Sequence, residues 1–342
     1  MTWRTILDES PILGRGAAAT YRDVPCRTVI GPTRAGSGDP RRALNPYVDC
    51  ELACPYCVGH QLNERRGVGT LGAVVGAKTG APGVVRRELA RRPEALVVVG
   101  TATDPYQPLE RRLGLTRRVL EEVAAAPGVP VEVATKSDLV TRDLPVLRRL
   151  ADEGRVRVVV SLATTDGPLS RSLEPRAPDP RARLAAVERL AAAGVPVGLA
   201  AAPVLPGITS SSRELRRLVC AAAQAGARFF RARVLTLPPA ARGPFLTWLA
   251  GERPELVATY RRWYRHDLPP PRVRERVEVT VAALRRQYRL ASDHPLPGEP
   301  PPSAQLTLFD PPRPRVEGGA RRSLRSLPRA EAARPRGRPV GA

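Results

Sequence analysis

Residues 131–161 read VEVATKSDLVTRDLPVLRRLADEGRVRVVVS. Runs rich in β-branched residues at 131–134 and 155–161 predict two buried strands, and the apolar spacing at 143–152 predicts a helix between them. Parallel strands need a crossover connection of this kind, whereas antiparallel strands can be joined by a short turn. The segment therefore predicts a βαβ unit with parallel strands.

The same alternation continues on both sides of this unit, from about residue 41 to residue 236. Further strands are predicted before Asn45 and at 95–100, 195–201 and 229–235, with helices at 84–92, 109–126, 179–193 and 212–225. Six such units predict an α/β fold, namely a partial (β/α)6 TIM-like barrel. We expect residues 1–40 to form an N-terminal segment, 41–236 the barrel, 237–292 a helical arginine-rich extension and 293–342 a disordered basic tail rich in Pro and Arg.

The composition of the chain limits its class. Its 342 residues include 55 Lys plus Arg against 33 Asp plus Glu, and 42% are hydrophobic, which excludes a wholly disordered protein. No apolar run approaches the roughly 18 residues of a membrane helix, and Asp8 and Glu9 stand where a signal peptide would be apolar. We therefore expect a cytoplasmic protein without a membrane partner. Lys78 and Lys136 are the only lysines, so each calls for an explanation.

Three of the five cysteines lie close together. Cys50, Cys54 and Cys57 form a C-x3-C-x2-C pattern, which in a cytosolic chain favours metal binding over a disulfide framework. Three thiolates can bind three irons of a four-iron cluster and leave the fourth iron open for a ligand. His60 follows at a spacing that would instead complete a Cys3His zinc site. On these four residues alone, both sites remain open.

The residues around the cysteines resemble a known family. With Tyr56, the pattern reads C-x3-C-x-aromatic-C, which is similar to the cluster motif of the radical S-adenosylmethionine (radical SAM) superfamily. Blocks that begin at Asn45, Gly100, Thr135, Ser161 and Ala202, together with Leu173-Glu174-Pro175 and Arg183, resemble those of its spore photoproduct lyase-like branch, in the same order. This resemblance covers about residues 43–265. The branch that the chain resembles includes DNA-repair proteins.

The resemblance implies two cofactors and a set of residues that contact them. A [4Fe-4S] cluster would be held by Cys50, Cys54 and Cys57, and its free iron would bind S-adenosyl-L-methionine. The remaining cofactor contacts would come from Tyr56, Thr103, Asp104, Lys136 and Ser161. Each matched block follows a predicted strand, so these side chains should meet at the C-terminal mouth of the barrel. Thr103, Asp104 and Ser161 are equally typical of strand-end caps and turns.

The resemblance also implies a reaction. The reduced cluster would cleave SAM to methionine and a 5'-deoxyadenosyl radical, which abstracts a substrate hydrogen. Photoproduct lyases carry a hydrogen-donating cysteine where this chain has Thr101, so literal photoproduct repair is not expected. Nucleic acid or a nucleobase is the leading substrate class. The alternatives are a radical enzyme acting on a peptide or small molecule, and a zinc-stabilised nucleic-acid-binding protein without redox chemistry.

Two regions bear on partners. Arginines between residues 261 and 286 are interleaved with Tyr260, Trp263, Tyr264 and Tyr288, which indicates either a nucleic-acid surface or aromatic side chains turned into the core. The QLTLF segment from Gln305 to Phe309 resembles the pentapeptide that docks on bacterial sliding clamps, although it could instead fold back onto the barrel. The reaction further implies an electron donor such as flavodoxin or ferredoxin.

Overall fold

The computed structural model describes residues 2–33, 41–91, 96–297 and 299. These residues belong to one unit, Met1–Phe309, whereas the second unit, Asp310–Ala342, lies outside the described residues. The first unit is built around a seven-stranded sheet in the order β11-β10-β9-β8-β7-β4-β3. Its strands are β3 (Ile30–Pro32), β4 (Arg42–Leu44), β7 (Val97–Val99), β8 (Val131–Thr135), β9 (Val156–Ser161), β10 (Val197–Val204) and β11 (Phe229–Val234).

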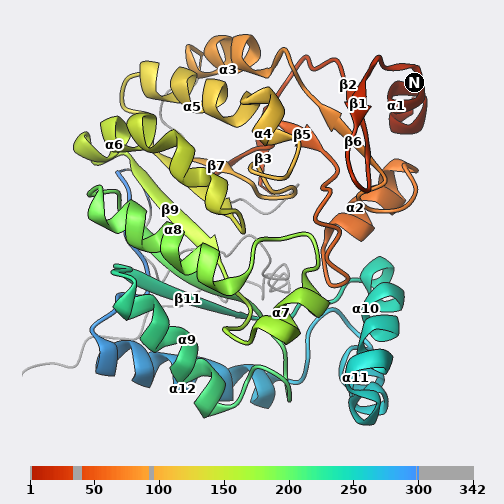
Figure 1. Cartoon of the computed structure of the whole chain (residues 1–342), viewed down its shortest axis with the longest axis vertical. Coiled ribbons are helices and arrows are strands. Elements are labelled where there is room, and N and C mark those ends of the chain that lie inside the picture. Colours follow the sequence, from red (N-terminus) through yellow and green to blue (C-terminus); the bar gives the residue numbers. More distant parts are fainter. Residues whose placement is uncertain (1, 34–40, 92–95, 298, 300–342) are drawn as a thin grey trace, which may run out of the picture. The chain divides into compact units, whose positions relative to one another are not determined.

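Six of these strands are parallel to their neighbours, from β4 to β11, and only β3 runs antiparallel to the adjacent β4. Figure 1 shows the sheet with helices along its outer side. The predicted partial (β/α)6 barrel is therefore confirmed. The covering helices are α3 (Ala81–Leu89), α4 (Glu110–Leu113), α5 (Leu115–Ala125), η1 (Asp138–Asp143), α6 (Leu144–Asp152), α8 (Pro180–Ala192) and α9 (Ser212–Gln224).

Local chemistry sets where several of these helices begin and end. The Asp179 side chain accepts a hydrogen bond from the Ala182 amide at 2.8 Å, and Pro180 occupies the first turn of α8. The single helix expected at 109–126 is divided, because Gly114 adopts a left-handed conformation with a φ of 58°. This glycine ends α4 and starts α5.

An additional sheet joins the N-terminal segment to the cysteine region. Its order is β1-β2-β6-β5, with β1 (Ile12–Arg15), β2 (Thr20–Asp23), β5 (Tyr47–Val48) and β6 (Val74–Ala77). Leu7 of α1 (Trp3–Glu9) packs against Val24 and Val48 beside this sheet. These strands were not predicted from the sequence, because two to four residues are too few for a periodic pattern.

Buried charges fill the inside of the barrel at its lower end. Glu132 of β8 and Arg157 of β9 lie opposite each other in the sheet. Their neighbours along each strand pack on the helices, so these two side chains point to the other face of the sheet, inside the barrel. Arg157 and Glu132 lie 2.6 Å apart, and Arg231 of β11 also binds Glu132 at 3.0 Å. Burial would raise the pKa of Glu132, but the Arg231 and Arg157 guanidiniums outweigh burial and lower this pKa to about 2. The carboxylate is therefore held in its charged form.

The residues after 292 take part in this network. Arg157 binds Glu299 at 2.5 Å, Arg231 binds Asp293 at 2.5 Å, and Leu296 packs against Leu96 and Val98. The described residues 293–297 and 299 thus contact the barrel, although we expected the disordered tail to begin at 293. The rest of that tail, including the QLTLF segment, lies outside the described residues.

Gly198 of β10 provides a test of packing inside the barrel. A Cβ atom at this position would lie 2.2 Å from the ring of Phe229, which is fully buried. We expect Gly198→Ala to destabilise the protein by about 1–3 kcal/mol, because the ring must shift within a packed interior. The control is Gly251 of α10 (Pro239–Glu252), where a Cβ meets nothing within 4 Å. Gly251→Ala should therefore stabilise the protein slightly. Urea denaturation of both variants checks this, and equal stabilities would contradict the packing.

The C-terminal extension is helical, as expected. It comprises α10 (Pro239–Glu252), η2 (Pro254–Leu256), α11 (Val257–Trp263) and α12 (Pro271–Tyr288). Tyr260 and Tyr264 are buried, and their hydroxyls donate to the carbonyls of Pro206 at 2.7 Å and Leu235 at 3.1 Å. Trp263 and Tyr288 are half-buried against the core. The interleaved aromatic side chains therefore form core contacts rather than an exposed stacking surface.

No helix among the described residues is both long enough and apolar enough to cross a membrane.

Candidate active site

The cysteine loop follows β5 and is folded by its own backbone. The amide of Ala53 donates to the carbonyl of Cys50 at 3.2 Å, and the amide of Cys57 donates to that of Cys54 at 3.0 Å. Cys50 and Cys54 are buried, Cys57 is half-buried, and all three are free thiols. These two turns bring the three thiols of the motif into one short loop.

Asp49, which no sequence pattern singled out, organises this loop. Its carboxylate accepts hydrogen bonds from the amide of Cys50 at 2.6 Å, from the side chain of Asn63 at 3.0 Å and from the amide of Gly72 at 3.0 Å. A Cβ at Gly72 would lie 3.0 Å from the Cys50 carbonyl, so the backbone must approach closely here. The φ of 67° at Asp49 fits a short polar side chain that bonds locally.

Two backbone amides donate to the sulfurs. The amide of Asp104 lies 3.5 Å from Cys50 Sγ, and the amide of Gly59 lies 3.2 Å from Cys57 Sγ. Burial raises the pKa of Cys54 to about 12, although the Lys136 ammonium works in the opposite direction. A buried thiolate therefore needs a positive partner, and bound iron would supply one. Hydrogen bonds to the sulfurs are a recognised way to tune the potential of an iron–sulfur cluster.

The described residues do not assemble the zinc site that the sequence left open. Nε2 of His60 lies 3.2 Å from the carbonyl oxygen of Cys54, so only its Nδ1 atom is left for a metal. Within the described part of the chain, no three His, Cys, Asp or Glu side chains are arranged to hold a single metal ion. A cluster does not require such convergence, because each cysteine binds a different iron.

Asn45 and Asp104 shape the loop after β7. The side-chain oxygen of Asn45 accepts hydrogen bonds from the amides of Ala102 at 3.0 Å and Thr103 at 3.4 Å, and its nitrogen donates to the Thr101 hydroxyl at 2.8 Å. The carboxylate of Asp104 accepts three further hydrogen bonds. Their donors are the amide of Tyr106 at 2.9 Å, the hydroxyl of Thr135 at 2.7 Å and the amide of Lys136 at 2.7 Å. Asp104 therefore fastens this loop to the end of β8, and its contact with a cofactor stays a prediction.

Thr103 differs from its neighbours. The residue is 6% exposed, and its Oγ1 is among the buried polar atoms of the described residues that have no hydrogen-bond partner. A buried hydroxyl without a partner costs about 1–3 kcal/mol. The residue lies immediately before Asp104, whose amide faces the sulfur of Cys50. This hydroxyl is therefore free to bind a ligand next to the cysteine loop.

Lys136 lies over the ring of Tyr56, with Nζ 5.8 Å from the ring centre. Burial favours the neutral amine, but Cys54, Glu174 and Asp104 hold the pKa of Lys136 above its ordinary value. The Tyr56 hydroxyl in turn donates to Glu174. Thus two of the five residues expected to contact the cofactor, Tyr56 and Lys136, lie together beside a buried carboxylate.

Glu174 and Arg183 form a fully buried ion pair. Arg183 Nη1 lies 2.5 Å from Glu174 Oε2, and the side chains are 0% and 1% exposed. The same guanidinium donates to the carbonyl of Ser161 at 3.0 Å. Ser161 itself donates its hydroxyl to the carbonyl of Ala202 at 2.9 Å. Arg183 therefore joins the Tyr56–Glu174 pair to the end of β9, and the role of Ser161 in cofactor binding stays a prediction.

Comparison with known proteins identifies this arrangement. The family model of the radical SAM superfamily matches residues 44–219. The chain belongs to the radical SAM superfamily. An uncharacterised protein of Mycobacterium tuberculosis is 38% identical over 302 residues, which cover 85% of this chain and 88% of the relative. An uncharacterised protein of Methanocaldococcus jannaschii is 23% identical over 185 residues, or 54% of this chain and 68% of the relative.

The fold of this radical SAM protein is that of spore photoproduct lyase. A variant of that lyase with bound AdoMet and dinucleoside spore photoproduct superposes with a TM-score of 0.62 at 17% identity, covering 81% of this chain and 84% of the lyase chain. Radical SAM proteins use a [4Fe-4S] cluster and SAM. The loop of three thiols with amides directed at two sulfurs fits the cluster, and the unpartnered Thr103 hydroxyl beside it fits a polar second ligand.

Proposed function

We propose that this radical SAM enzyme cleaves SAM reductively and uses the resulting 5'-deoxyadenosyl radical on a nucleic acid or a nucleobase. The substrate class is supported by the shared fold with a lyase whose solved structure contains AdoMet and a dinucleoside photoproduct. The formal net charge of +22 also favours an anionic partner. Thr101 supplies no thiol to a product radical, so we propose a lyase-like or modification reaction other than photoproduct repair.

The roles of the chain's own residues follow from their surroundings. When bound, the cluster supplies one electron to SAM, which releases methionine and the 5'-deoxyadenosyl radical. Cys50, Cys54 and Cys57 would hold the cluster, and the backbone amides of Gly59 and Asp104 would stabilise the negative charge on its sulfurs. The burial of this loop limits the access of water.

We assign SAM binding to three side chains. Thr103 offers its unpartnered hydroxyl, Lys136 offers an ammonium for a carboxylate, and Tyr56 offers an aromatic ring whose hydroxyl is already bound to Glu174. The single observation that carries this assignment is the buried hydroxyl of Thr103, because nothing in the described protein satisfies it.

Thr103→Val tests that assignment. Removing an unpartnered hydroxyl should leave the free energy of unfolding unchanged or slightly increased, whereas SAM affinity should fall by about 5- to 10-fold, corresponding to a net hydrogen bond of about 1 kcal/mol. Thr141→Val is the matched control, because its hydroxyl donates to the Asp138 carbonyl at 2.9 Å. The control should lose stability and retain SAM affinity. Isothermal titration of the anaerobic cluster-loaded protein gives the affinities, and unchanged SAM binding by Thr103→Val would refute the assignment.

The substrate class is tested by turnover. The cluster-loaded protein is incubated without oxygen with SAM, dithionite and one of three pools: single-stranded DNA, transfer RNA or mixed peptides. We expect a nucleic-acid pool to raise the rate of 5'-deoxyadenosine formation, and uniformly deuterated nucleic acid to transfer deuterium to that product. Stimulation by peptides alone would contradict the proposed substrate class.

The other expected partners stay predictions. A sliding clamp would bind the segment from Gln305 to Phe309, which lies outside the described residues, and flavodoxin or ferredoxin would supply electrons.

A further inference from the structure

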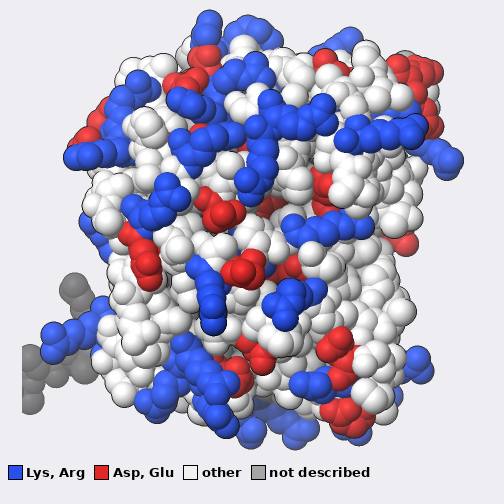
Figure 2. All heavy atoms as spheres, viewed as in Figure 1, with Lys and Arg blue, Asp and Glu red and all other residues white. Residues whose placement is uncertain are grey.

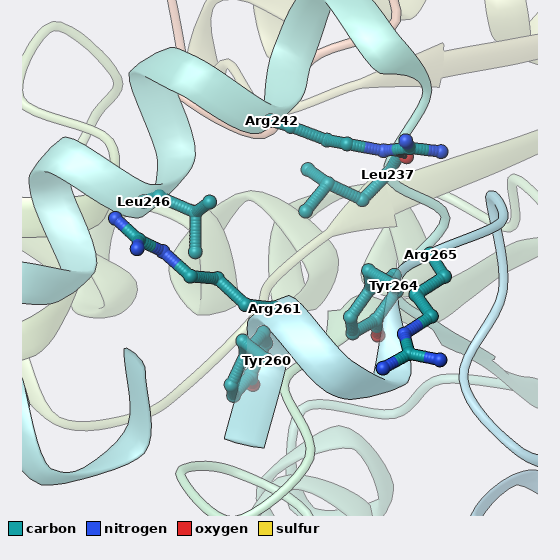
Figure 3. A pocket seen from close by; sticks show the side chains of 7 residues that line it. All are labelled: Leu237, Arg242, Leu246, Tyr260, Arg261, Tyr264 and Arg265. Atoms are coloured by element: carbon teal, nitrogen blue, oxygen red, sulfur yellow. Dashed lines mark hydrogen bonds between the residues drawn. The ribbon is translucent and has the colours of Figure 1, made fainter. Parts of the chain in front are cut away.

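A pocket of about 190 Å³ lies where α10 and α11 meet the segment after β11 (Figure 3). Its lining residues are Leu237, Arg242, Leu246, Tyr260, Arg261, Tyr264 and Arg265. Leu237, Leu246, Tyr260 and Tyr264 form the floor of the pocket. This floor is apolar, because both tyrosine hydroxyls already donate to backbone carbonyls. The arginines are the only charged residues in this set.

The charge around this pocket is not balanced. Arg242 binds Asp267 at 3.3 Å. Arg261 and Arg265 are exposed, and no ion pair joins either of them to a carboxylate among the described residues. In Figure 3 the Arg261 side chain extends toward Leu246, whereas the Arg242 and Arg265 side chains lie toward Leu237 and Tyr264. Positive charge therefore borders the apolar floor on two sides.

This local excess differs from the mixed charge pattern on one face of the molecule. On the face seen in Figure 2, Lys and Arg are spread widely, with Asp and Glu between them. The positive charge is therefore not concentrated in one continuous patch on that face. At the pocket, by contrast, guanidiniums are combined with a recess that can receive part of a ligand.

The pocket is close to the candidate active site in the fold. Leu237 follows the carboxyl end of β11, on the side of the barrel where the cysteine loop lies. One apolar cluster contains Leu237, Tyr260 and Tyr264 together with Cys50, Cys54 and Tyr56. Moreover, α10 packs against α2 (Gly59–Arg66), which directly follows Cys57. A ligand held in the pocket would therefore be anchored at the rim of the barrel mouth.

We propose that this pocket is a phosphate-binding subsite that anchors the nucleic-acid substrate, a proposal that rests on the proposed function. The apolar floor takes part of one nucleotide, and the guanidiniums on the two sides take the flanking phosphates. Arginine suits this role, because its planar fork matches phosphate oxygens in a bidentate manner. Single-stranded nucleic acid provides an apolar base and regularly spaced phosphates together.

The test compares two pairs of substitutions that remove the same charge. Arg261→Gln with Arg265→Gln alters the pocket, whereas Arg272→Gln with Arg276→Gln removes two exposed arginines of α12 that do not line it. Binding of a fluorescent single-stranded oligonucleotide to the cluster-loaded protein is measured by anisotropy at several salt concentrations. The pocket pair should weaken binding by about 10-fold or more and reduce the slope of log affinity against log salt by about one to two.

The control pair should bind within about 2-fold of the unaltered protein, as expected of scattered surface charge. Formation of 5'-deoxyadenosine without nucleic acid should be the same in all three proteins, because no altered residue lies in the cysteine loop. Equal weakening of oligonucleotide binding by both pairs would overturn the pocket proposal. The proposal would also be overturned if the pocket pair lost binding to polyglutamate, an anionic polymer without phosphates, but kept its binding to the oligonucleotide. If the unaltered protein binds no nucleic acid and none stimulates turnover, the proposed function fails as well.

Discussion

Cys54→Ser should abolish the iron–sulfur centre. The residue is one of the three thiols of the motif, each of which would bind a different iron of the cluster. A hydroxyl does not replace a thiolate on iron, so we expect reconstituted iron and sulfide to fall to background and the rate of 5'-deoxyadenosine formation to fall by at least about 100-fold. Iron and sulfide analysis and visible absorption check the first effect, and chromatography of the nucleoside checks the second.

Cys220→Ser is the matched control for this experiment. Cys220 lies on α9, away from the motif, and is a free, half-buried thiol. The variant should retain the iron content and activity of the unaltered protein. A Cys54→Ser protein that keeps a full cluster, or a Cys220→Ser protein that loses it, would contradict the assignment of the ligands.

Arg183→Met should have the largest effect on stability. The substitution leaves the carboxylate of Glu174 buried without its guanidinium partner, and removing one partner of a buried ion pair typically costs about 3–5 kcal/mol. The loss extends to function, because Glu174 accepts the hydrogen bond of Tyr56 and Arg183 binds the carbonyl of Ser161. Anaerobic guanidinium denaturation of the cluster-loaded protein measures the change.

A double variant separates charge from packing at this pair. In Arg183→Met with Glu174→Leu no buried charge is left alone, so the double variant should recover part of the lost stability. The two single variants and the double variant form a double-mutant cycle, and its coupling energy measures the interaction between Glu174 and Arg183. If the loss of stability in the double variant equals the sum of the losses in the two single variants, the pair is not coupled.

The parallel sheet was predictable from the sequence because its strands are buried on both faces. Such strands read as continuous β-branched runs, and the predicted strand at 131–134 and helix at 143–152 correspond to β8 and α6. The N-terminal sheet left no comparable signal in its short strands. The charges inside the barrel depend on contacts between distant segments, and Arg157 and Glu299 are separated by 142 positions. No local pattern reports such contacts.

The candidate site likewise has features that the sequence predicts and features that it does not. The cysteine spacing is a local pattern, so it is visible in the sequence alone. By contrast, the sequence could not tell which of two adjacent polar residues has a free side chain. The Asp104 carboxylate is occupied by three protein donors, whereas the Thr103 hydroxyl has no partner among the described residues. Similarly, Tyr260 and Tyr264 are interleaved with arginines in the sequence, yet helical periodicity directs their rings into the core.

The central claim is that three thiols hold a cluster at which SAM is cleaved. Its most direct test is the anaerobic incubation of the cluster-loaded protein with SAM and dithionite, followed by quantification of 5'-deoxyadenosine and methionine. We predict that both products form in equal amounts and only when the reductant is present. A protein with a complete, reduced cluster that leaves SAM intact, even with nucleic acid added, would contradict this claim.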